Sequence, residues 1–466
     1  MNIYKPCDIR GRAADDLTPD LYRSWGRALG HQVPPQSKFV AGGDVRGSTP
    51  GFLAALIDGL CDADLDVVDL GQLPTPMIYH ARRRLAAAGC AAVTASHNPA
   101  EINGLKWMVG GRPPSEREVL ALQRGADDPR SVPSGRRRGA WRRLDVSFDY
   151  VAWLQETWVD AMGAECHLVL DPMHGCLARR ARRYLHAVFP QSLISAVHDD
   201  PHPAFAGCTP DCSRPHRLDE LCEAVYRQRA HVGIAFDGDG DRLALVDDLA
   251  LPLTAEETTW CLLQSYGPQL RGERFVYDLK FSNRVPETAE RLGAESLVER
   301  SGHAFIRNRM LKTGALFGAE ISGHYFFRAL DGGDDGLFAA CRLIAYLAES
   351  GQTLSELREG CPQVFITPDL RVSLGPDDQR AILDQVQTSW AEHPQSTLDG
   401  IRIDFPDGWA LVRSSVTEPA LTFRFEASDP GWLEELVRRF CQPLADVGIE
   451  LWSRYEATMG GGTCEA

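Results

Sequence analysis

Strand-like and helix-like segments alternate along the first three quarters of the chain, and this alternation limits the fold more than any other feature. Short apolar runs at residues 39–41, 66–70 and 90–94 are expected to be strands. Between them lie segments with helical spacing, expected to begin at Thr18-Pro19 and Thr49-Pro50. Since parallel strands are joined by crossover helices, the pattern predicts α/β units with mainly parallel sheets.

The same alternation recurs twice more. Apolar strands expected at residues 167–170 and 232–236 mark a second series. A third series has a capping box formed by Thr254 and Glu257, followed by a strand expected at residues 275–277. Three similar α/β domains are therefore predicted.

The last hundred residues follow a different pattern. Apolar and polar residues alternate over 401–405 and 421–425, as in a half-exposed antiparallel sheet. An amphipathic helix is expected to cover this sheet with Trp432, Leu433, Leu436, Val437 and Phe440. We therefore expect a C-terminal α+β domain. The predicted domains span residues 1–144, 145–249, 250–363 and 364–466.

Residues 115–144 contain an arginine-rich stretch, SVPSGRRRGAWRRL, in which no helical period organises the charges. Arg136, Arg137 and Arg138 could form an anion-binding patch. A solvated loop or domain linker is the favoured interpretation, because Trp141 is the only aromatic residue among the arginines.

Charge and hydropathy exclude several classes of partner. The chain of 466 residues has a formal net charge of −15, which opposes binding to nucleic acid or an anionic membrane. No apolar run approaches the roughly 20 residues of a bilayer span. The first residues lack an apolar signal core, so a cytoplasmic protein is expected.

The 13 cysteines include no CxxC pair, and most are expected to be small buried hydrophobes.

Three aspartates at alternate positions, Asp237, Asp239 and Asp241, follow the second series' last strand. Carboxylates spaced by glycines can converge on one hard cation, and without compensation they repel one another. An EF-hand is excluded because its sixth position requires Gly and here is Arg242. A phosphatase of the haloacid-dehalogenase type, with Asp237 or Asp239 as nucleophile, stays open as an alternative.

The run Thr94-Ala-Ser96-His97-Asn-Pro99 follows another strand, where α/β proteins place ligand sites. Ser96 could act as a nucleophile and His97 could polarise a phosphoryl group. Taken alone, the run favours a polar turn. Lys106 is close enough in sequence to supply a cationic proton donor to the same site, which favours a functional role.

Two later loops carry polar groups suited to a sugar phosphate. Glu320, Ser322 and His324 offer donors and acceptors for sugar hydroxyls. The same residues fit equally well as an ordinary loop that leads into a strand. Residues 413–419, RSSVTEP, combine a fork-shaped arginine with hydroxyls, a mixture that suits phosphate; a polar hairpin loop is the alternative.

Together these four loops resemble those of the α-D-phosphohexomutase superfamily, and more narrowly its phosphomannomutase/phosphoglucomutase branch. TASHNP, DGDGDR, an ExSGH loop and an RxSxTEP-like loop occur in the family's order over nearly the whole chain. The resemblance implies three similar mixed-sheet α/β domains and a C-terminal α+β domain of the TATA-binding-protein-like kind, arranged around a central cleft.

The resemblance also implies residue roles. Ser96 would carry a phosphoryl group, and an oxygen of that phosphoserine would hold Mg²⁺ with Asp237, Asp239 and Asp241. The expected catalytic residues are Ser96, His97, Lys106 as a general acid/base, Arg242 and Arg10. The expected substrate-binding residues are Lys280, His303, Glu320, Ser322, His324, Arg413, Ser415, Thr417 and Arg424.

Three positions depart from the family's pattern. Cys7 stands where Tyr is usual, Gly43 where Arg is usual, and Val416 where Asn is usual. Each lost hydrogen bond removes about 0.5–1.5 kcal/mol of net stabilisation. We expect affinity and substrate choice to be affected, while the residues of phosphoryl transfer are all present.

The implied activity is a phosphohexomutase acting on hexose 1-phosphate and hexose 6-phosphate of mannose, glucose or both. It would pass through a hexose 1,6-bisphosphate intermediate, in a monomer or homodimer. Phosphoglucosamine mutase is an alternative, although Phe326-Phe327 and the run Asp334-Asp335-Gly336 look more like the first branch. A third alternative is a non-catalytic sugar-phosphate-binding homologue, which the three departures favour and the intact Ser96 opposes.

Overall fold

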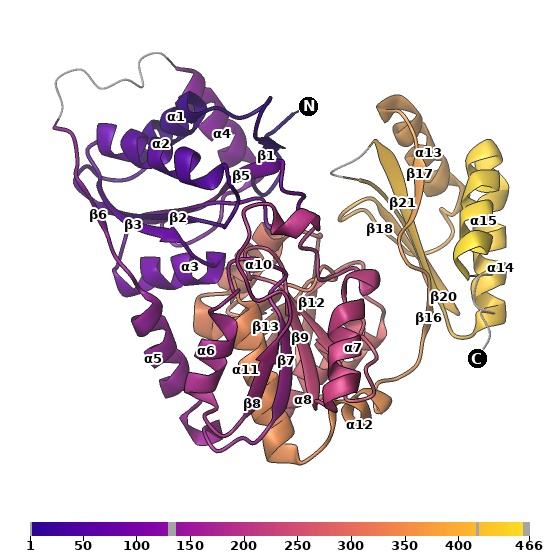
Figure 1. Cartoon of the computed structure of the whole chain (residues 1–466). Helices are drawn as coiled ribbons and strands as arrows, with labels where there is room; N and C mark the ends of the chain where they lie inside the picture. Colours follow the sequence, from indigo (N-terminus) through magenta and orange to yellow (C-terminus); the bar gives the residue numbers. More distant parts are fainter. Residues whose placement is uncertain (1, 129–136, 416–418, 460–466) are drawn as a thin grey trace. The chain divides into compact units, whose positions relative to one another are not determined.

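The computed structural model of the chain describes residues 2–128, 137–415 and 419–459 (Figure 1). They form two compact units. The first unit comprises residues 1–277, 288–297 and 302–361, and the second comprises 278–287, 298–301 and 362–466, less the undescribed residues. Within the described residues, no helix has the length and apolar character needed to cross a membrane.

The first sheet is mixed, with strand order β1-β5-β4-β2-β3-β6. The predicted strands β2, β3 and β4 are parallel, and β5 and β1 extend the sheet in antiparallel fashion. Figure 1 shows α1, α2 and α4 on one side of this sheet and α3 on the other. The strands are β1 (Ile9–Arg12), β2 (Lys38–Gly43), β3 (Asp66–Gln72), β4 (Gly89–Val93), β5 (Ile102–Val109) and β6 (Trp141–Arg143). The helices are α1 (Pro19–Gly30), α2 (Thr49–Asp62), α3 (Thr75–Arg84) and α4 (Glu116–Asp127).

Two further mixed sheets complete the predicted α/β series, with orders β10-β9-β7-β8 and β12-β11-β13-β14-β15. Their strands are β7 (His167–Asp171), β8 (Leu193–Ala196), β9 (Val232–Phe236), β10 (Leu243–Val246), β11 (Arg274–Asp278), β12 (Glu295–Glu299), β13 (Phe317–Ala319), β14 (Tyr325–Phe327) and β15 (Gly333–Asp334). The accompanying helices are α5 (Ser147–Thr157), α6 (Ala181–Val188), α7 (Asp219–Gln228), α8 (Ala255–Tyr266), α9 (Arg284–Arg291), α10 (His303–Thr313), α11 (Gly336–Ser350) and α12 (Leu354–Glu359). The predicted capping box of Thr254 and Glu257 begins α8.

The second unit contains the predicted antiparallel sheet, ordered β16-β21-β20-β19-β18 with β17 also on β21. Its core joins Phe423 and Phe425 of the sheet to Leu433, Val437 and Phe440 of α14. The α+β prediction is therefore confirmed. The strands are β16 (Phe365–Ile366), β17 (Leu370–Ser373), β18 (Gln395–Ser396), β19 (Ile401–Phe405), β20 (Gly408–Ser414) and β21 (Ala420–Ala427). The helices are α13 (Pro376–Ser389), α14 (Pro430–Cys441) and α15 (Ala445–Met459).

Two expectations for this unit were wrong. Trp432 does not pack on the sheet but is 49% exposed. Strand β21 is buried along its whole length rather than half-exposed. The reason is that Leu279, from a distant part of the chain, packs with Trp409 and Leu411 on the sheet's second face.

Residues 115–128 and 137–144, the described parts of the segment that contains the arginine-rich stretch, include regular structure. Ser115 and Glu118 form a capping box that begins α4, and β6 pairs with β3. Arg137 Nη2 lies 3.0 Å from Asp66 Oδ1, and Arg138 pairs with Asp58, so both arginines are neutralised locally. Arg136 lies outside the described residues. Most described cysteines are buried free thiols, as predicted.

Candidate active site

Ser96 lies in the turn after β4, fully buried and with a backbone φ of 52°. Its N–H donates to Thr94 Oγ1 over 2.9 Å, and its Oγ donates to Asp237 Oδ2 over 2.7 Å. His97 Nδ1 is 3.3 Å from the same Oγ. A left-handed conformation is strained for a non-glycine residue and persists where surrounding structure enforces it. The turn therefore presents the Ser96 hydroxyl to the aspartate loop.

Arg46 holds this turn in place through hydrogen bonds to its backbone carbonyl groups. Its guanidinium has no exposed surface and donates to the carbonyl oxygens of Ser96 at 2.9 Å and Asn98 at 2.7 Å. Asp44 Oδ2 accepts from Arg46 Nε over 2.8 Å. Neither residue was among the predicted site residues. The available signal was a charged pair, Asp44-Val-Arg46, directly after an apolar strand, because such charges are buried only when paired.

The three aspartates converge in the loop after β9. Each offers an oxygen within 4.8 Å of the others, and all three side chains are buried. Asp237 Oδ1 accepts from the N–H groups of Gly240 at 3.0 Å and Arg242 at 3.3 Å. Asp239 Oδ1 has no hydrogen-bond partner among the described residues. A buried carboxylate oxygen without a donor fits a cation ligand.

Asp239 also ties the aspartate loop to the first sheet. Its Oδ2 accepts from Thr75 Oγ1 at 2.8 Å, Thr94 Oγ1 at 3.2 Å and Lys106 Nζ at 2.9 Å. Thr75, at the start of α3, was not predicted as a site residue. Three donors on one oxygen fix the loop against the Ser96 turn.

Lys106, on β5, is buried and lies 2.5 Å from Asp241 Oδ2. Burial lowers the pKa of Lys106, but Asp239 and Asp241 raise it well above its usual value, so the side chain stays an ammonium. Burial would raise the pKa of Asp241, yet Lys106 and His324 hold it well below its usual range. Burial, together with Asp241 and Asp239, raises the pKa of Asp237 to about 8.

Two arginines border the serine. Arg242 is buried, with Nε 3.8 Å from Asp237 Oδ2 and Nη1 3.6 Å from Asp211 Oδ1. Arg10 Nε donates to Asp8 Oδ2 over 2.9 Å, and its Nη1 donates to Asn98 in the serine turn. Burial, Arg242 and Arg10 all lower the pKa of His97 well below its usual value, which keeps its imidazole neutral.

The loop before β14 meets the aspartate loop. Leu243 N–H donates to Gly323 O over 3.0 Å, which joins the two backbones. Ser322 Oγ and His324 Nδ1 are 2.8 Å apart, and Glu320 Oε2 is 3.7 Å from the same nitrogen. The three predicted residues therefore form one cluster around His324 Nδ1.

His303 begins α10, and its ring lies 6.0 Å from that of His324, between centroids. Burial and then Lys106 lower the pKa of His303 to about 3, so its imidazole is neutral at pH 7. The first unit thus gathers most of the predicted site residues. They are Arg10, Ser96, His97, Lys106, Asp237, Asp239, Asp241, Arg242, His303, Glu320, Ser322 and His324.

The remaining predicted residues belong to the second unit. Lys280 Nζ is 2.6 Å from Asp369 Oδ2, and Arg413 Nη2 is 2.9 Å from Asp399 Oδ2. Arg424 Nε donates to Thr367 O over 3.2 Å. The pairing of Arg413 with Thr422 and of Leu411 with Arg424 puts both arginines on one face of the sheet. Ser415 N–H donates to Ala420 O over 2.8 Å, whereas Val416 and Thr417 lie outside the described residues.

The departure at Gly43 has a steric explanation. A Cβ at this position would lie 2.5 Å from Thr49 Cγ2 and 2.7 Å from Val93 O. Such distances leave no room for an arginine side chain without shifts of the surrounding chain.

The chain matches four domain families in order. Their descriptions are "Phosphoglucomutase/phosphomannomutase, alpha/beta/alpha domain I" at residues 2–127, the corresponding domain II at 149–249, domain III at 258–365 and the C-terminal domain at 373–442.

Relatives are similar over nearly the full chain. A protein of Pseudomonas aeruginosa named phosphomannomutase/phosphoglucomutase is 30% identical over 97% of both chains. A phosphoglucomutase of Neisseria gonorrhoeae is 30% identical over 94% of this chain and 96% of its own. The crystal structure of a phosphoglucomutase/phosphomannomutase family protein from Burkholderia thailandensis has a TM-score of 0.84 at 28% identity, covering 99% of this chain and 98% of that one.

Proposed function

The chain belongs to the phosphoglucomutase/phosphomannomutase family, and from this premise we propose that it interconverts hexose 1-phosphates and hexose 6-phosphates of glucose, mannose or both. We place the phosphoryl carrier at Ser96. The observation that carries the proposal is the 2.7 Å hydrogen bond from Ser96 Oγ to Asp237, in a buried group of three aspartates beside Lys106.

The same contacts argue against an aspartyl nucleophile. Asp237 accepts from Ser96 through Oδ2 and from backbone N–H groups through Oδ1. Asp239 Oδ2 accepts three hydrogen bonds. Carboxylate oxygens that accept hydrogen bonds or hold a cation, the role proposed below for Asp239 Oδ1, are poor nucleophiles, whereas Ser96 Oγ donates to Asp237 and keeps its lone pairs for a phosphoryl group.

The aspartate loop fits Mg²⁺. All its ligand atoms are carboxylate oxygens, which hard cations prefer. Asp239 Oδ1 is buried without a hydrogen-bond donor among the described residues, so a bound cation would stabilise its negative charge. We propose that Asp237, Asp239 and Asp241 hold the ion together with an oxygen of phospho-Ser96. When bound, Mg²⁺ offsets the negative charge of the transferring phosphoryl group.

In the proposed reaction, the phosphoryl group leaves Ser96 Oγ for a hydroxyl oxygen of the sugar monophosphate, and the hydroxyl proton replaces it on Oγ. Lys106, held as an ammonium, stabilises or protonates the oxygens that exchange the group. Arg242 and the neutral His97 orient the phosphoryl oxygens. The hexose 1,6-bisphosphate then reorients and returns its other phosphoryl group to Ser96.

The reorientation requires binding groups that accept either end of the sugar. We propose that Glu320, Ser322, His324 and His303 contact sugar hydroxyls. The phosphate that is not transferred is assigned to Lys280, Arg413, Ser415, Thr417 and Arg424. Arginine and hydroxyl groups bind phosphate through charge and bidentate hydrogen bonds, so they can bind it whether it is attached to carbon 1 or carbon 6 of the sugar.

A coupled assay of the full chain tests this function. Glucose 1-phosphate and mannose 1-phosphate, with Mg²⁺ and a trace of the matching 1,6-bisphosphate, should give the 6-phosphates. Exclusive turnover of glucosamine 1-phosphate would instead identify a phosphoglucosamine mutase. Absence of turnover on all three sugars, with substrate binding retained, would identify a non-catalytic homologue. The domain boundaries at residues 144, 249 and 363 stay predictions.

A further inference from the structure

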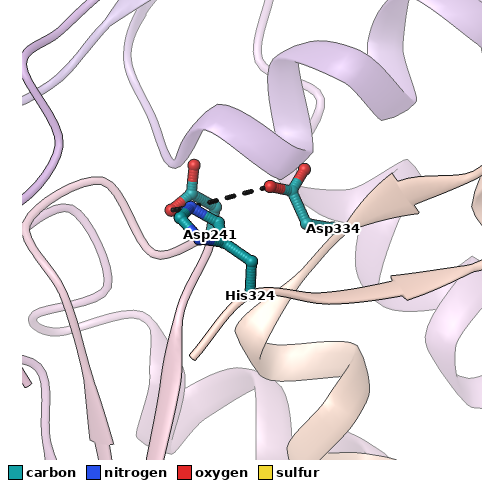
Figure 2. Close-up of side chains that lie close together, drawn as sticks. All are labelled: Asp241, His324 and Asp334. Carbon is teal, nitrogen blue, oxygen red and sulfur yellow. Dashed lines mark ion pairs between the residues drawn. The ribbon is translucent and has the colours of Figure 1, made fainter. Parts of the chain in front are cut away.

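A second group of potential metal ligands adjoins the aspartate loop. Asp241, His324 and Asp334 each offer one atom within 4.8 Å of the others, and all three side chains are buried. Figure 2 shows them pointing toward one another from the aspartate loop, the loop before β14 and strand β15. This cluster differs from the aspartate triad in containing an imidazole.

The three nearest atoms of this cluster are buried and close together, yet none of them makes a hydrogen bond to a described residue. His324 Nε2 is 3.1 Å from Asp241 Oδ1 and 3.8 Å from Asp334 Oδ2. Despite these distances, all three atoms lack a hydrogen bond of acceptable geometry among the described residues. Buried polar atoms normally make hydrogen bonds, so three such atoms that lie within 4.8 Å of one another, linked by ion pairs but without a hydrogen bond to a described residue, indicate a place for a ligand.

The spacing suits a metal ion. With metal–ligand bonds of ~2.0–2.1 Å and tetrahedral angles, ligand atoms lie about 3.3 Å apart. The two distances from Nε2 bracket this value. We propose that Asp241, His324 and Asp334 form a second cation site, which binds a divalent transition metal such as Zn²⁺ or Co²⁺ and leaves one coordination position open.

The ligand set distinguishes this site from the magnesium site proposed above. Imidazole nitrogen favours Zn²⁺ and its neighbours in the transition series, whereas Mg²⁺ prefers oxygen alone. Asp241 belongs to both groups, since its Oδ2 faces Lys106 and its Oδ1 faces His324. A shared carboxylate is common where two metal ions are neighbours. Occupation would also engage His324, which the proposed function assigns to the sugar, so the transition metal should compete with substrate.

Cobalt binding tests the proposal directly. The full chain is titrated with Co²⁺ in excess Mg²⁺, and binding is followed by visible absorption. Near-ultraviolet charge-transfer bands separate cobalt on cysteine thiolates from cobalt on nitrogen and oxygen ligands. We expect one tight equivalent with nitrogen and oxygen ligands. Asp334→Asn should weaken its binding at least tenfold, whereas Asp335→Asn, a change of the adjacent buried carboxylate, should not.

Asp239→Asn separates the two sites. It alters the aspartate triad but none of the second site's ligands, so the cobalt equivalent should persist. Loss of that equivalent in Asp239→Asn, or equal affinity in wild type and Asp334→Asn, would overturn the proposal, as would the absence of any tight equivalent. If no cobalt ion binds tightly, a protonated His324 that pairs with both carboxylates would explain the cluster better than a metal ion. Thermal melting without metal confirms that each variant is folded. Because the readout is binding, failure of the mutase function would not affect it.

Discussion

Arg46 Nη2 donates to the carbonyl oxygen of Ser96 over 2.9 Å, from a side chain that has no exposed surface. The same guanidinium also reaches the carbonyl oxygens of Asn98, Pro99 and Ile102. One buried charge thus fixes the backbone at the proposed phosphoryl carrier and in the residues that follow it, and Asp44 neutralises this charge.

Arg46→Met should destabilise the protein strongly. It leaves Asp44 buried without its partner, a change that typically costs about 3–5 kcal/mol. Urea denaturation measures the loss. Arg137→Met, at a half-exposed ion pair, should cost no more than about 1 kcal/mol. Equal losses in the two variants would contradict the anchoring role of Arg46.

Asp239→Asn should weaken Mg²⁺ activation and lower turnover while leaving Ser96 able to accept a phosphoryl group. The substitution removes one charge from the cation site but keeps an oxygen that can accept from Thr75 and Lys106. Turnover is measured against Mg²⁺ concentration. A trapped aspartyl phosphate in the wild type would favour the phosphatase mechanism instead.

Arg413→Ala should raise KM for the sugar phosphate about 10–100-fold, with a smaller change in kcat. This range corresponds to the loss of charged hydrogen bonds worth roughly 1.5–3 kcal/mol. Asp399→Asn is the matched control, because it removes the ion-pair partner of Arg413 but keeps the guanidinium. An unchanged KM in Arg413→Ala would exclude it from the phosphate site.

His80 should make stability depend on pH. Burial, with Arg83 and Arg84, lowers its pKa from 6.5 to about 4, and neither ring nitrogen has a hydrogen-bond partner among the described residues. Between these pKa values the unfolded chain binds more protons, so the stability is complete above pH 6.5 and is lost as pH falls toward 4.

His80→Phe keeps an aromatic ring beside Tyr150 and Trp153 but cannot titrate. Its free energy of unfolding should therefore fall less than that of the wild type between pH 7 and pH 4.5, by on the order of 2 kcal/mol. Parallel losses in both proteins, measured by urea denaturation, would show that His80 is not responsible.

Much of the fold could be predicted because its elements carry local signals. The Pro residue in the first turn of α2 and the apolar run of β9 depend on neighbouring residues alone. Helix α4 was not predicted, although Ser115 and Glu118 form its capping box, because the arginine-rich run that follows favours a solvated loop and only Val119 and Leu122 of the helix are buried. The burial of β21 could not be predicted, since the second face of its sheet packs against Leu279, which lies far away in sequence.

The candidate site likewise contains residues that local motifs predict and residues whose contacts depend on tertiary packing. Ser96 and the three aspartates stand in recognisable loops, and the structure brings them within hydrogen-bonding distance of one another and of Lys106 on β5. The contact of Thr75 with Asp239 depends on how two sheets pack, which no local pattern encodes. Arg46 was not predicted as a site residue, because the pair Asp44-Val-Arg46 indicates a buried ion pair but not which backbone carbonyl groups the arginine contacts.

The most direct test of the account is the phosphorylation state of Ser96. The full chain, incubated with glucose 1,6-bisphosphate and Mg²⁺, is analysed by intact mass and peptide mapping, and mutase activity is measured on the same sample. We expect one added phosphoryl group on Ser96, and in Ser96→Ala neither the adduct nor mutase activity. Full mutase activity in Ser96→Ala, or a phosphoryl group mapped to Asp237 or Asp239 in the wild type, would contradict the account.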